Sequence, residues 1–265
     1  MSEQRFFDPS LMAGRVAVVT GGGSGLGLAI SEALLRHGAR VAIASRNAER
    51  LRAAAEGLTE RTGRPCLDVV CDVRRPEQVQ ALRETVTERL GPAGVLVNNA
   101  AGNFRVPAEH MTLRGFGTVV DIDLMGTFNT TMAFLPDLRA AGNAAVTSIV
   151  VPEPDRGFPG FAHAGAAKAA IVSLTRSWAR EWGPYGIRVN AVGPGPVPTE
   201  GVAAHMLAVP DGNPEQAFPE WAESLPLGRL GTPQDVASCV LFLSSPAASW
   251  ITGALLPVDG GLSVA

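Results

Sequence analysis

The feature that most constrains this chain is a glycine-rich turn that directly follows a short apolar run. Residues 16–20 are Val-Ala-Val-Val-Thr, and Gly-Gly-Gly-Ser-Gly-Leu-Gly follows at residues 21–27. The β-branched run favours a buried strand, and the amphipathic stretch Leu26–His37 favours a helix that stops before Gly38. Because glycine permits a tight turn and a close approach to the backbone, this order predicts the first strand–helix unit of a parallel α/β sheet.

The same alternation of short apolar runs and longer amphipathic stretches continues along the chain. It predicts helices that include Asn47–Thr62, Pro76–Leu90 and Ala164–Trp182. The expected strands are Val16–Thr20, Val41–Ser45, Leu67–Cys71, Val95–Asn98, Ala145–Val150, Arg188–Val192 and Leu255–Val258. No repeat or change of composition divides the 265 residues. The pattern therefore predicts a parallel sheet that helices cover on both faces.

Composition narrows the possible partners and compartments. The net charge of −3 argues against nucleic acid or an anionic membrane as a partner. No apolar run approaches the roughly 18 residues that span a bilayer, and the first residues lack the features of a secretion signal. Three cysteines without metal-ligand spacing indicate reduced structural thiols and no metal site. We expect a soluble, cytoplasmic protein that binds neither nucleic acid nor membrane.

The glycine turn is also a candidate phosphate site. Gly21, Gly25 and Gly27 have the spacing Gly-x3-Gly-x-Gly and open a predicted helix. The positive end of a helix and its free N–H groups attract a pyrophosphate, and glycines let it come close. The residues expected to contact it are Gly21, Gly23, Ser24, Gly25, Leu26 and Gly27.

The end of the second strand predicts which dinucleotide binds. NAD-preferring sites usually place an acidic residue there, whereas this chain has Ser45 and Arg46. A serine can donate to a 2′-phosphate and an arginine can pair with it bidentately, so we predict NADP(H). Asp72 is placed to meet the adenine edge. The further cofactor contacts are expected at the ends of the third, fourth and sixth strands: Asp72, Val73, Asn98, Asn99, Ala100, Pro194, Gly195, Val197 and Thr199.

One segment departs from the regular alternation. The residues between Pro194 and Leu230 include six further prolines, with large apolar side chains scattered among acidic and small ones. The segment follows the sixth strand, at the sheet edge where ligands bind in such folds. We interpret residues 196–230 as a substrate lid, with a surface loop as the alternative.

Together these landmarks resemble the short-chain dehydrogenase/reductase family across essentially the whole chain. The resemblance implies a single doubly wound Rossmann domain over residues 1–265, with a seven-stranded parallel sheet, usually assembled as a homotetramer. The family's usual catalytic set is Asn, Ser, Tyr and Lys, and only Lys168 matches it here. The Asn position is Asp123, the Ser position is Val151 and the Tyr position is Ala164.

No tyrosine stands at a spacing from Lys168 that could replace the missing phenol. The chain has one tyrosine, Tyr185, and an alternative spacing to the lysine finds Phe161. Ser148 lies three residues before the Ser position and is expected within a strand. Reduction of a ketone needs a proton donor beside the new alkoxide, so ordinary carbonyl chemistry is in doubt.

A narrower resemblance accommodates these departures. The runs 99–104, 121–123 and 163–168 look like the peroxisomal-type 2,4-dienoyl-CoA reductases, a branch that lacks the tyrosine and uses an aspartate with the lysine. This resemblance implies reduction of a conjugated acyl thioester in unsaturated fatty acid β-oxidation. It makes Asp123 and Lys168 catalytic, and it places the acyl-CoA against Arg74, Asn103 and Phe104.

That chemistry tolerates the absence of a phenol. Hydride adds at the far end of the conjugated system, charge moves to the thioester oxygen, and a proton then goes to carbon. Lys168 would hold the nicotinamide ribose and Asp123 would orient a proton-delivering water, while His163 abuts the site. Two alternatives stay open. One is an alcohol or ketone dehydrogenase in which His163 or water replaces tyrosine, and the other is a catalytically inactive NADP-binding relative.

Overall fold

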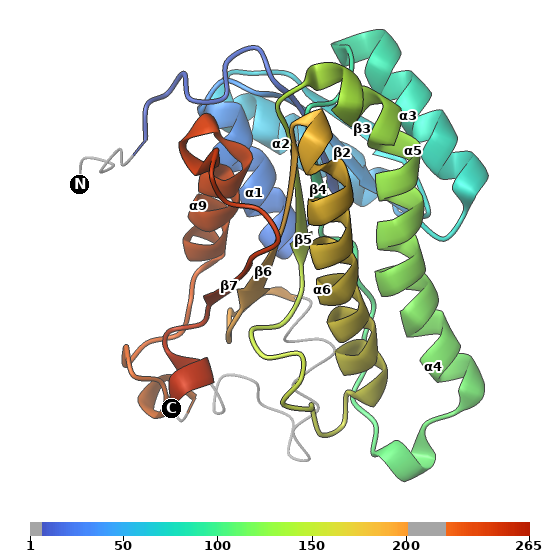
Figure 1. The fold of residues 1–265 in the computed structure, drawn as a ribbon, viewed down its shortest axis with the longest axis vertical. Helices are drawn as coiled ribbons and strands as arrows, with labels where there is room; N and C mark the ends of the chain where they lie inside the picture. Colours follow the sequence, from blue (N-terminus) through green and yellow to red (C-terminus); the bar gives the residue numbers. More distant parts are fainter. Residues whose placement is uncertain (1–6, 201–220) are drawn as a thin grey trace.

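A parallel sheet of seven strands runs through the middle of the molecule (Figure 1). The computed structural model describes residues 7–200 and 221–265. The strand order is β3-β2-β1-β4-β5-β6-β7, so the chain first winds outward in one direction from β1 and then in the other from β4. This order confirms the doubly wound Rossmann arrangement, in which ligands bind at the carboxyl ends of the strands near the reversal. The strands are β1 (Val16–Thr20), β2 (Arg40–Ser45), β3 (Cys66–Val70), β4 (Val95–Asn98), β5 (Ala144–Ile149), β6 (Ile187–Pro194) and β7 (Leu255–Val258).

Helices cover both faces of the sheet. One layer contains α1 (Gly25–Arg36), α2 (Ala48–Thr62) and α9 (Pro233–Ser244), and the other contains α3 (Pro76–Leu90), α5 (Gly126–Ala141) and α6 (Ala162–Trp182). Successive side chains of β1 pack against opposite helix layers. Val19 packs with residues of α1, and Val18 packs with residues of α3. This is why the strands are continuously apolar rather than alternating.

The predicted elements agree closely with the observed ones. β1, β4, β7 and α3 have the expected bounds, and β3 lies one residue earlier than expected. β6 is longer than predicted because it stays paired with β7 as far as Pro194, which lies opposite Val258. α1 ends before Gly38, whose φ of +99° lies in the region that favours glycine.

The connection between β4 and β5 contains a feature that the sequence did not reveal. α4 (Leu113–Val120) and α5 are joined by a π-helical turn, η2 (Asp121–Met125). In Figure 1 the α4 end of this long helical stretch extends well below the sheet. π-Helical turns in helices often occur at functional sites, and this one contains Asp123. Within the described residues, no helix has the length and apolarity needed to cross a membrane.

Candidate functional site

Two glycines of the turn after β1 are required by their surroundings. A Cβ on Gly27 would lie 2.3 Å from the carbonyl oxygen of Gly21, so α1 could not approach the turn so closely with any larger residue. Gly21 has a φ of +65°, and a Cβ there would lie 2.9 Å from Nδ2 of Asn99. That amide donates to the carbonyl oxygens of Thr20 and Gly21, at 3.0 and 3.1 Å. The predicted cofactor residue Asn99 therefore braces the turn itself.

Thr20, at the end of β1, fixes the neighbouring loop to the same place. Its hydroxyl oxygen accepts hydrogen bonds from the backbone N–H groups of Asn99, at 3.0 Å, and of Ala100, at 3.1 Å. The side chain of Asn98 is buried and donates to Thr131 on α5. Thr20 gives no signal in the sequence, because a threonine at the end of an apolar strand is an ordinary strand residue.

The amino terminus of α1 is open to an anion. Ser24 occupies the N-cap position with an extended backbone, and its side chain makes no capping hydrogen bond. The first turn contains no acidic residue. The first backbone N–H groups of a helix have no partner inside the helix, so they are available to a phosphate here. The turn therefore fits the pyrophosphate of a dinucleotide.

The ends of β2 and β3 form the adjoining part of the site. Arg46 is exposed, and the hydroxyl of Ser45 lies 3.5 Å from where a Cβ on Gly23 would be. Arg74 donates from Nε to Asp72 at 2.9 Å, and this contact is the main reason why the pKa of Asp72 is lowered. The charge of Arg46 lowers that pKa further. Arg46 and Asp72, which are predicted to bind the cofactor, thus lie close to Arg74, which is predicted to bind acyl-CoA.

The segment after β6 returns to the glycine turn. The N–H of Gly195 donates to Val258 at 3.0 Å, and a Cβ on Gly195 would lie 2.6 Å from Cα of Asp259. Val197 is buried, and Cβ of Thr199 lies 3.5 Å from where a Cβ on Gly25 would be. Of the predicted contacts after β6, Thr199 therefore lies beside the turn, while Gly195 packs against the residue after β7.

The predicted lid over residues 196–230 is only partly described, because residues 201–220 lie outside the described ranges. Its two ends are joined. The N–H of Gly231 donates to the carbonyl oxygen of Pro196 at 3.0 Å, and a Cβ on Gly231 would lie 2.9 Å from a methyl carbon of Val197. The segment therefore leaves and re-enters the domain at one place.

Asp123 and Lys168 form a buried ion pair. Nζ of Lys168 lies 3.0 Å from Oδ2 of Asp123, and it also donates to the carbonyl oxygen of Ile149 at 3.0 Å. The two residues are 1% and 8% exposed, respectively. At this distance the attraction is roughly 5–6 kcal/mol for an effective dielectric of about 20, and the loss of hydration opposes it. The two residues predicted to be catalytic are thus brought into contact.

The second oxygen of Asp123 holds the loop after β4. Oδ1 accepts the N–H of Gly102 at 2.8 Å, immediately before the predicted substrate residues Asn103 and Phe104. The carboxylate therefore joins three separate segments, which are the π-helical turn, this loop and α6. The N–H of Gly102 and the carbonyl of Ile149 are backbone groups, which give no signal in a sequence.

The position that usually holds a tyrosine is filled by an apolar cluster. Ala164 lies one turn before Lys168 on α6 and packs with Val119 and Phe161. Tyr185, the chain's one tyrosine, is 43% exposed beyond the other end of α6, where the guanidinium of Arg139 lies 3.9 Å from its ring centroid. The helix from Lys168 to its end is about 20 Å long, so this phenol cannot reach the lysine.

The Ser position also lacks a donor. Val151 follows β5, and Ser148 lies within β5 as expected. The Ser148 hydroxyl is buried, and no described residue hydrogen-bonds to it. His163 is fully buried on the first turn of α6, and Phe104 packs edge-on against it with ring centroids 4.5 Å apart. Phe104 itself is 37% exposed.

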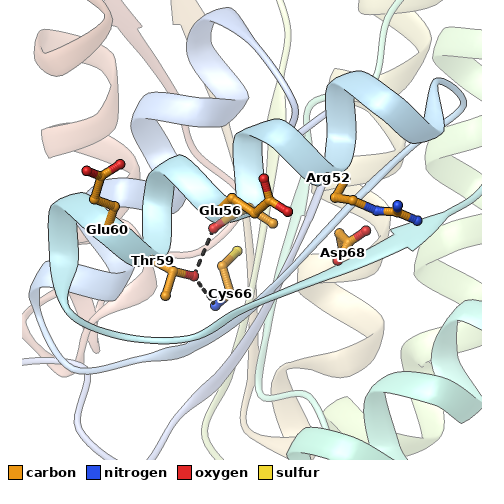
Figure 2. Close-up of a pocket in the computed structure, with 7 residues that line it drawn as sticks. Arg52, Glu56, Thr59, Glu60, Cys66 and Asp68 are labelled. Atoms are coloured by element: carbon orange, nitrogen blue, oxygen red, sulfur yellow. Dashed lines mark hydrogen bonds between the residues drawn. The ribbon is translucent and has the colours of Figure 1, made fainter.

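A concave surface between α2 and β3 lies away from these residues. Figure 2 shows Arg52, Glu56, Glu60 and Asp68 around it, with Cys66 and Thr59 below. The Thr59 hydroxyl donates to Ala55 at 2.8 Å and accepts from the backbone N–H of Cys66 at 3.2 Å. Burial, with a smaller effect from Asp68, raises the pKa of the Cys66 thiol to about 12, so the thiol is not a nucleophile at neutral pH. This surface contains none of the predicted site residues.

Comparison with known proteins agrees with this geometry. The family model described as enoyl-(acyl carrier protein) reductase matches residues 21–263. The chain belongs to the short-chain dehydrogenase/reductase family and is an NAD(P)-dependent oxidoreductase.

Curated relatives define the similarity more narrowly. The chain is 43% identical over 256 residues to a peroxisomal 2,4-dienoyl-CoA reductase [(3E)-enoyl-CoA-producing] of Danio rerio, covering 96% of this chain and 83% of the relative. The Rattus norvegicus protein of the same name is 41% identical, covering 96% and 86%. This chain is therefore similar to dienoyl-CoA reductases over almost its full length.

Solved structures extend the likeness to the fold. A short-chain oxidoreductase from Pseudomonas aeruginosa PAO1, described as NADPH-bound and as containing an atypical catalytic center, has a TM-score of 0.87 and 35% identity, covering 98% of this chain and 99% of that chain. Levodione reductase has a TM-score of 0.91 and 35% identity, covering 96% and 99%.

Proposed function

We propose that this protein catalyses the NADPH-dependent reduction of a conjugated acyl thioester, with a 2,4-dienoyl-CoA as the substrate. The observation that carries the proposal is the buried Asp123–Lys168 pair beside an alanine at the usual tyrosine position. The names of the curated relatives support the same substrate class. The pathway we propose is the β-oxidation of unsaturated fatty acids.

The chemistry explains why the site can lack a phenol. When bound, the dinucleotide supplies a hydride, which adds to the far carbon of the diene as its electrons shift onto the thioester oxygen. A proton then adds to a carbon between that carbon and the thioester oxygen, so that one dienoyl thioester, one hydride and one proton give one enoyl thioester. No alkoxide forms, so no acid is needed beside the carbon that receives the hydride.

The buried pair can perform the remaining tasks. Lys168 would hold the ribose next to the nicotinamide and contribute positive charge. Asp123 would orient a water that delivers the proton to carbon, since an ionised carboxylate accepts hydrogen bonds from water and from Lys168 at once. Its fixed contact with Gly102 keeps the oxygen atoms in place.

NADPH rather than NADH is supported by the end of β2. Arg46 is exposed and makes no side-chain hydrogen bond to a described residue, while the neighbouring Asp72 is paired with Arg74. A 2′-phosphate would therefore meet a free guanidinium and the Ser45 hydroxyl, without a free carboxylate to repel it. NADPH-bound relatives such as the Pseudomonas protein support this preference.

The loop after β4 is the proposed contact surface for acyl-CoA. Phe104 exposes an apolar ring two residues after Gly102, whose N–H Asp123 holds, and Asn103 precedes it. Arg74 offers a charge to a phosphate of CoA if the acyl-CoA reaches past the adenosine end.

The compartment and assembly state are also proposals. We propose a cytoplasmic homotetramer, and the exposed apolar side chains of Phe116, Phe128 and Met132 support an interface along α4 and α5.

The decisive experiment compares substrates while NADPH absorbance is followed. Hexadienoyl-CoA, crotonyl-CoA and a panel of ketones are each added to the purified protein. We expect turnover with hexadienoyl-CoA. Turnover with ketones alone would establish the carbonyl reductase instead, and tight NADPH binding without any turnover would establish an inactive binding protein. Light scattering on the same sample tests the tetramer.

A further inference from the structure

His163 has a hydrogen-bond donor that no described residue uses. The backbone N–H of Ala164 donates to Nδ1 of His163 at 2.8 Å, so that nitrogen must present its lone pair. The ring hydrogen therefore lies on Nε2. Nε2 is buried and has no partner among the described residues. A buried donor without a partner costs about 1–3 kcal/mol, so it calls for an explanation in function.

This donor belongs to a ring that contacts Phe104, a residue of the proposed acyl-CoA surface. The ring contacts Phe104, two residues after Gly102, whose N–H is held by Asp123. Along α6, His163 precedes Lys168 by five residues, or about 8 Å of helix axis, and both side chains are buried. The Phe104 ring stands nearly perpendicular to the imidazole and is itself partly exposed.

The proposed reaction needs a donor at the thioester oxygen, and the positions that supply one in the family do not supply it here. Negative charge gathers on the thioester oxygen, which preorganised donors must stabilise. Ala164 and Val151 stand where the family has hydroxyl groups, and neither can donate. Lys168 already directs N–H groups to Asp123 and to the carbonyl of Ile149.

We propose that Nε2–H of His163 donates to the thioester carbonyl oxygen of the bound acyl-CoA, after the ring of Phe104 moves aside. This inference rests on the proposed function and adds a catalytic residue to it. His163 stabilises charge and does not transfer a proton, because Nδ1 is engaged by Ala164 and cannot take up a replacement. The buried ring is thus a fixed dipole rather than an acid.

The test measures polarisation of the carbonyl itself. Hexadienoyl-CoA labelled with ¹³C at the thioester carbon is bound to the protein with NADP⁺, and its carbonyl stretch is recorded by infrared difference spectroscopy. We expect a lower frequency in the wild type than in His163→Phe. The kcat of His163→Phe should fall about 10²–10³-fold, the usual cost of one lost oxyanion donor. His163→Gln, which keeps a donor near Nε2, should recover most of both effects.

Controls separate the possible failures. His110→Phe removes an exposed imidazole from the 3₁₀ turn after the substrate loop and should change neither quantity. If His163→Phe does not fold, His163→Met removes the donor with a flexible side chain. Absence of wild-type turnover with hexadienoyl-CoA would overturn the proposed function. With an active wild type, an unchanged carbonyl frequency in the donor-free variant would overturn the assignment of His163, whatever happens to kcat.

Discussion

The nucleotide half and the acyl half of the site are built by different means. Around the glycine turn, the geometry depends on backbone: Gly27 meets the carbonyl of Gly21, and Thr20 receives two backbone N–H groups. Around Asp123, side chains from separate segments meet, and Asp123 reaches Lys168 only because a π-helical turn and α6 face each other. A site built from backbone tolerates little change in residue size, whereas one built from side chains tolerates little change in charge.

The largest effect should follow from removing the charge at the centre of the acyl half. Asp123→Asn keeps an oxygen that can accept the N–H of Gly102 but cannot hold water as a carboxylate does. We expect kcat for hexadienoyl-CoA to fall about 10²–10⁴-fold, the usual scale of general acid–base catalysis. The dissociation constant for NADPH, measured by fluorescence titration, should change only a few-fold.

Asp123→Ala separates chemistry from structure at the same position. It leaves Lys168 buried without its partner, and breaking a buried pair in this way costs about 3–5 kcal/mol of stability. We expect a clear fall in Tm in addition to the loss of kcat, whereas Asp123→Asn should melt closer to the wild type. Near-wild-type turnover in Asp123→Asn would show that the carboxylate does not serve the proton transfer.

The next effect tests the backbone-built half by size alone. Gly27→Ala places a Cβ where 2.3 Å separates it from the carbonyl of Gly21, so the turn and α1 must shift apart. Overpacking of this kind costs about 1–3 kcal/mol of stability. We expect a lower Tm and NADPH affinity weakened about tenfold, because the N–H groups that face the pyrophosphate move with the helix.

A matched glycine provides the control. Gly57 lies inside α2, and a Cβ there meets only the flexible end of Arg61. Because alanine favours a helix more than glycine does, Gly57→Ala should stabilise the protein by about 0.5–1 kcal/mol. If both variants bind NADPH like the wild type, the close contact at Gly27 is not what shapes the phosphate site.

A smaller and more selective effect is expected at the adenosine end. Arg46→Ala should raise the KM for NADPH about tenfold and leave that for NADH nearly unchanged, because only NADPH has a 2′-phosphate. Steady-state kinetics with both cofactors measures the split, and Arg52→Ala on the exposed side of α2 is the control. Equal changes for NADPH and NADH in Arg46→Ala would indicate a structural arginine.

The two halves also differ in how far the sequence predicts them. The strands and the glycine turn follow from local composition, since β-branched runs and glycine spacing constrain the backbone directly. α4 and α5 were not assigned, because Gly115 and Gly117 weaken the first and Pro136 interrupts the second. These helices form because tertiary packing overrides local preference, and that packing was not visible in the chain.

The residues of the acyl half show the same limit. Lys168 and Asp123 were predicted from a resemblance, but their 3.0 Å contact needs the fold to be known. The partners that fix them, the N–H of Gly102 and the carbonyl of Ile149, belong to any residue type. The unused donor of His163 likewise follows from a hydrogen bond to the next residue in the helix.

The smallest effect is expected where a tyrosine is restored, since activity should not rise. Ala164→Tyr restores the family's usual phenol one turn before Lys168, yet dienoyl reduction should not improve, because the proton acceptor is carbon and not an alkoxide. The site also packs Ala164 against Val119 and Phe161, so the larger ring must displace neighbours. Ketone reduction should stay absent too, since Val151 gives no hydroxyl to position a carbonyl. Both activities are measured by NADPH oxidation in the variant and the wild type. A large gain in either one would mean that the acyl half is an ordinary carbonyl-reducing site lacking only its phenol, and the distinction between the Asp123–Lys168 chemistry and that of the family would fail.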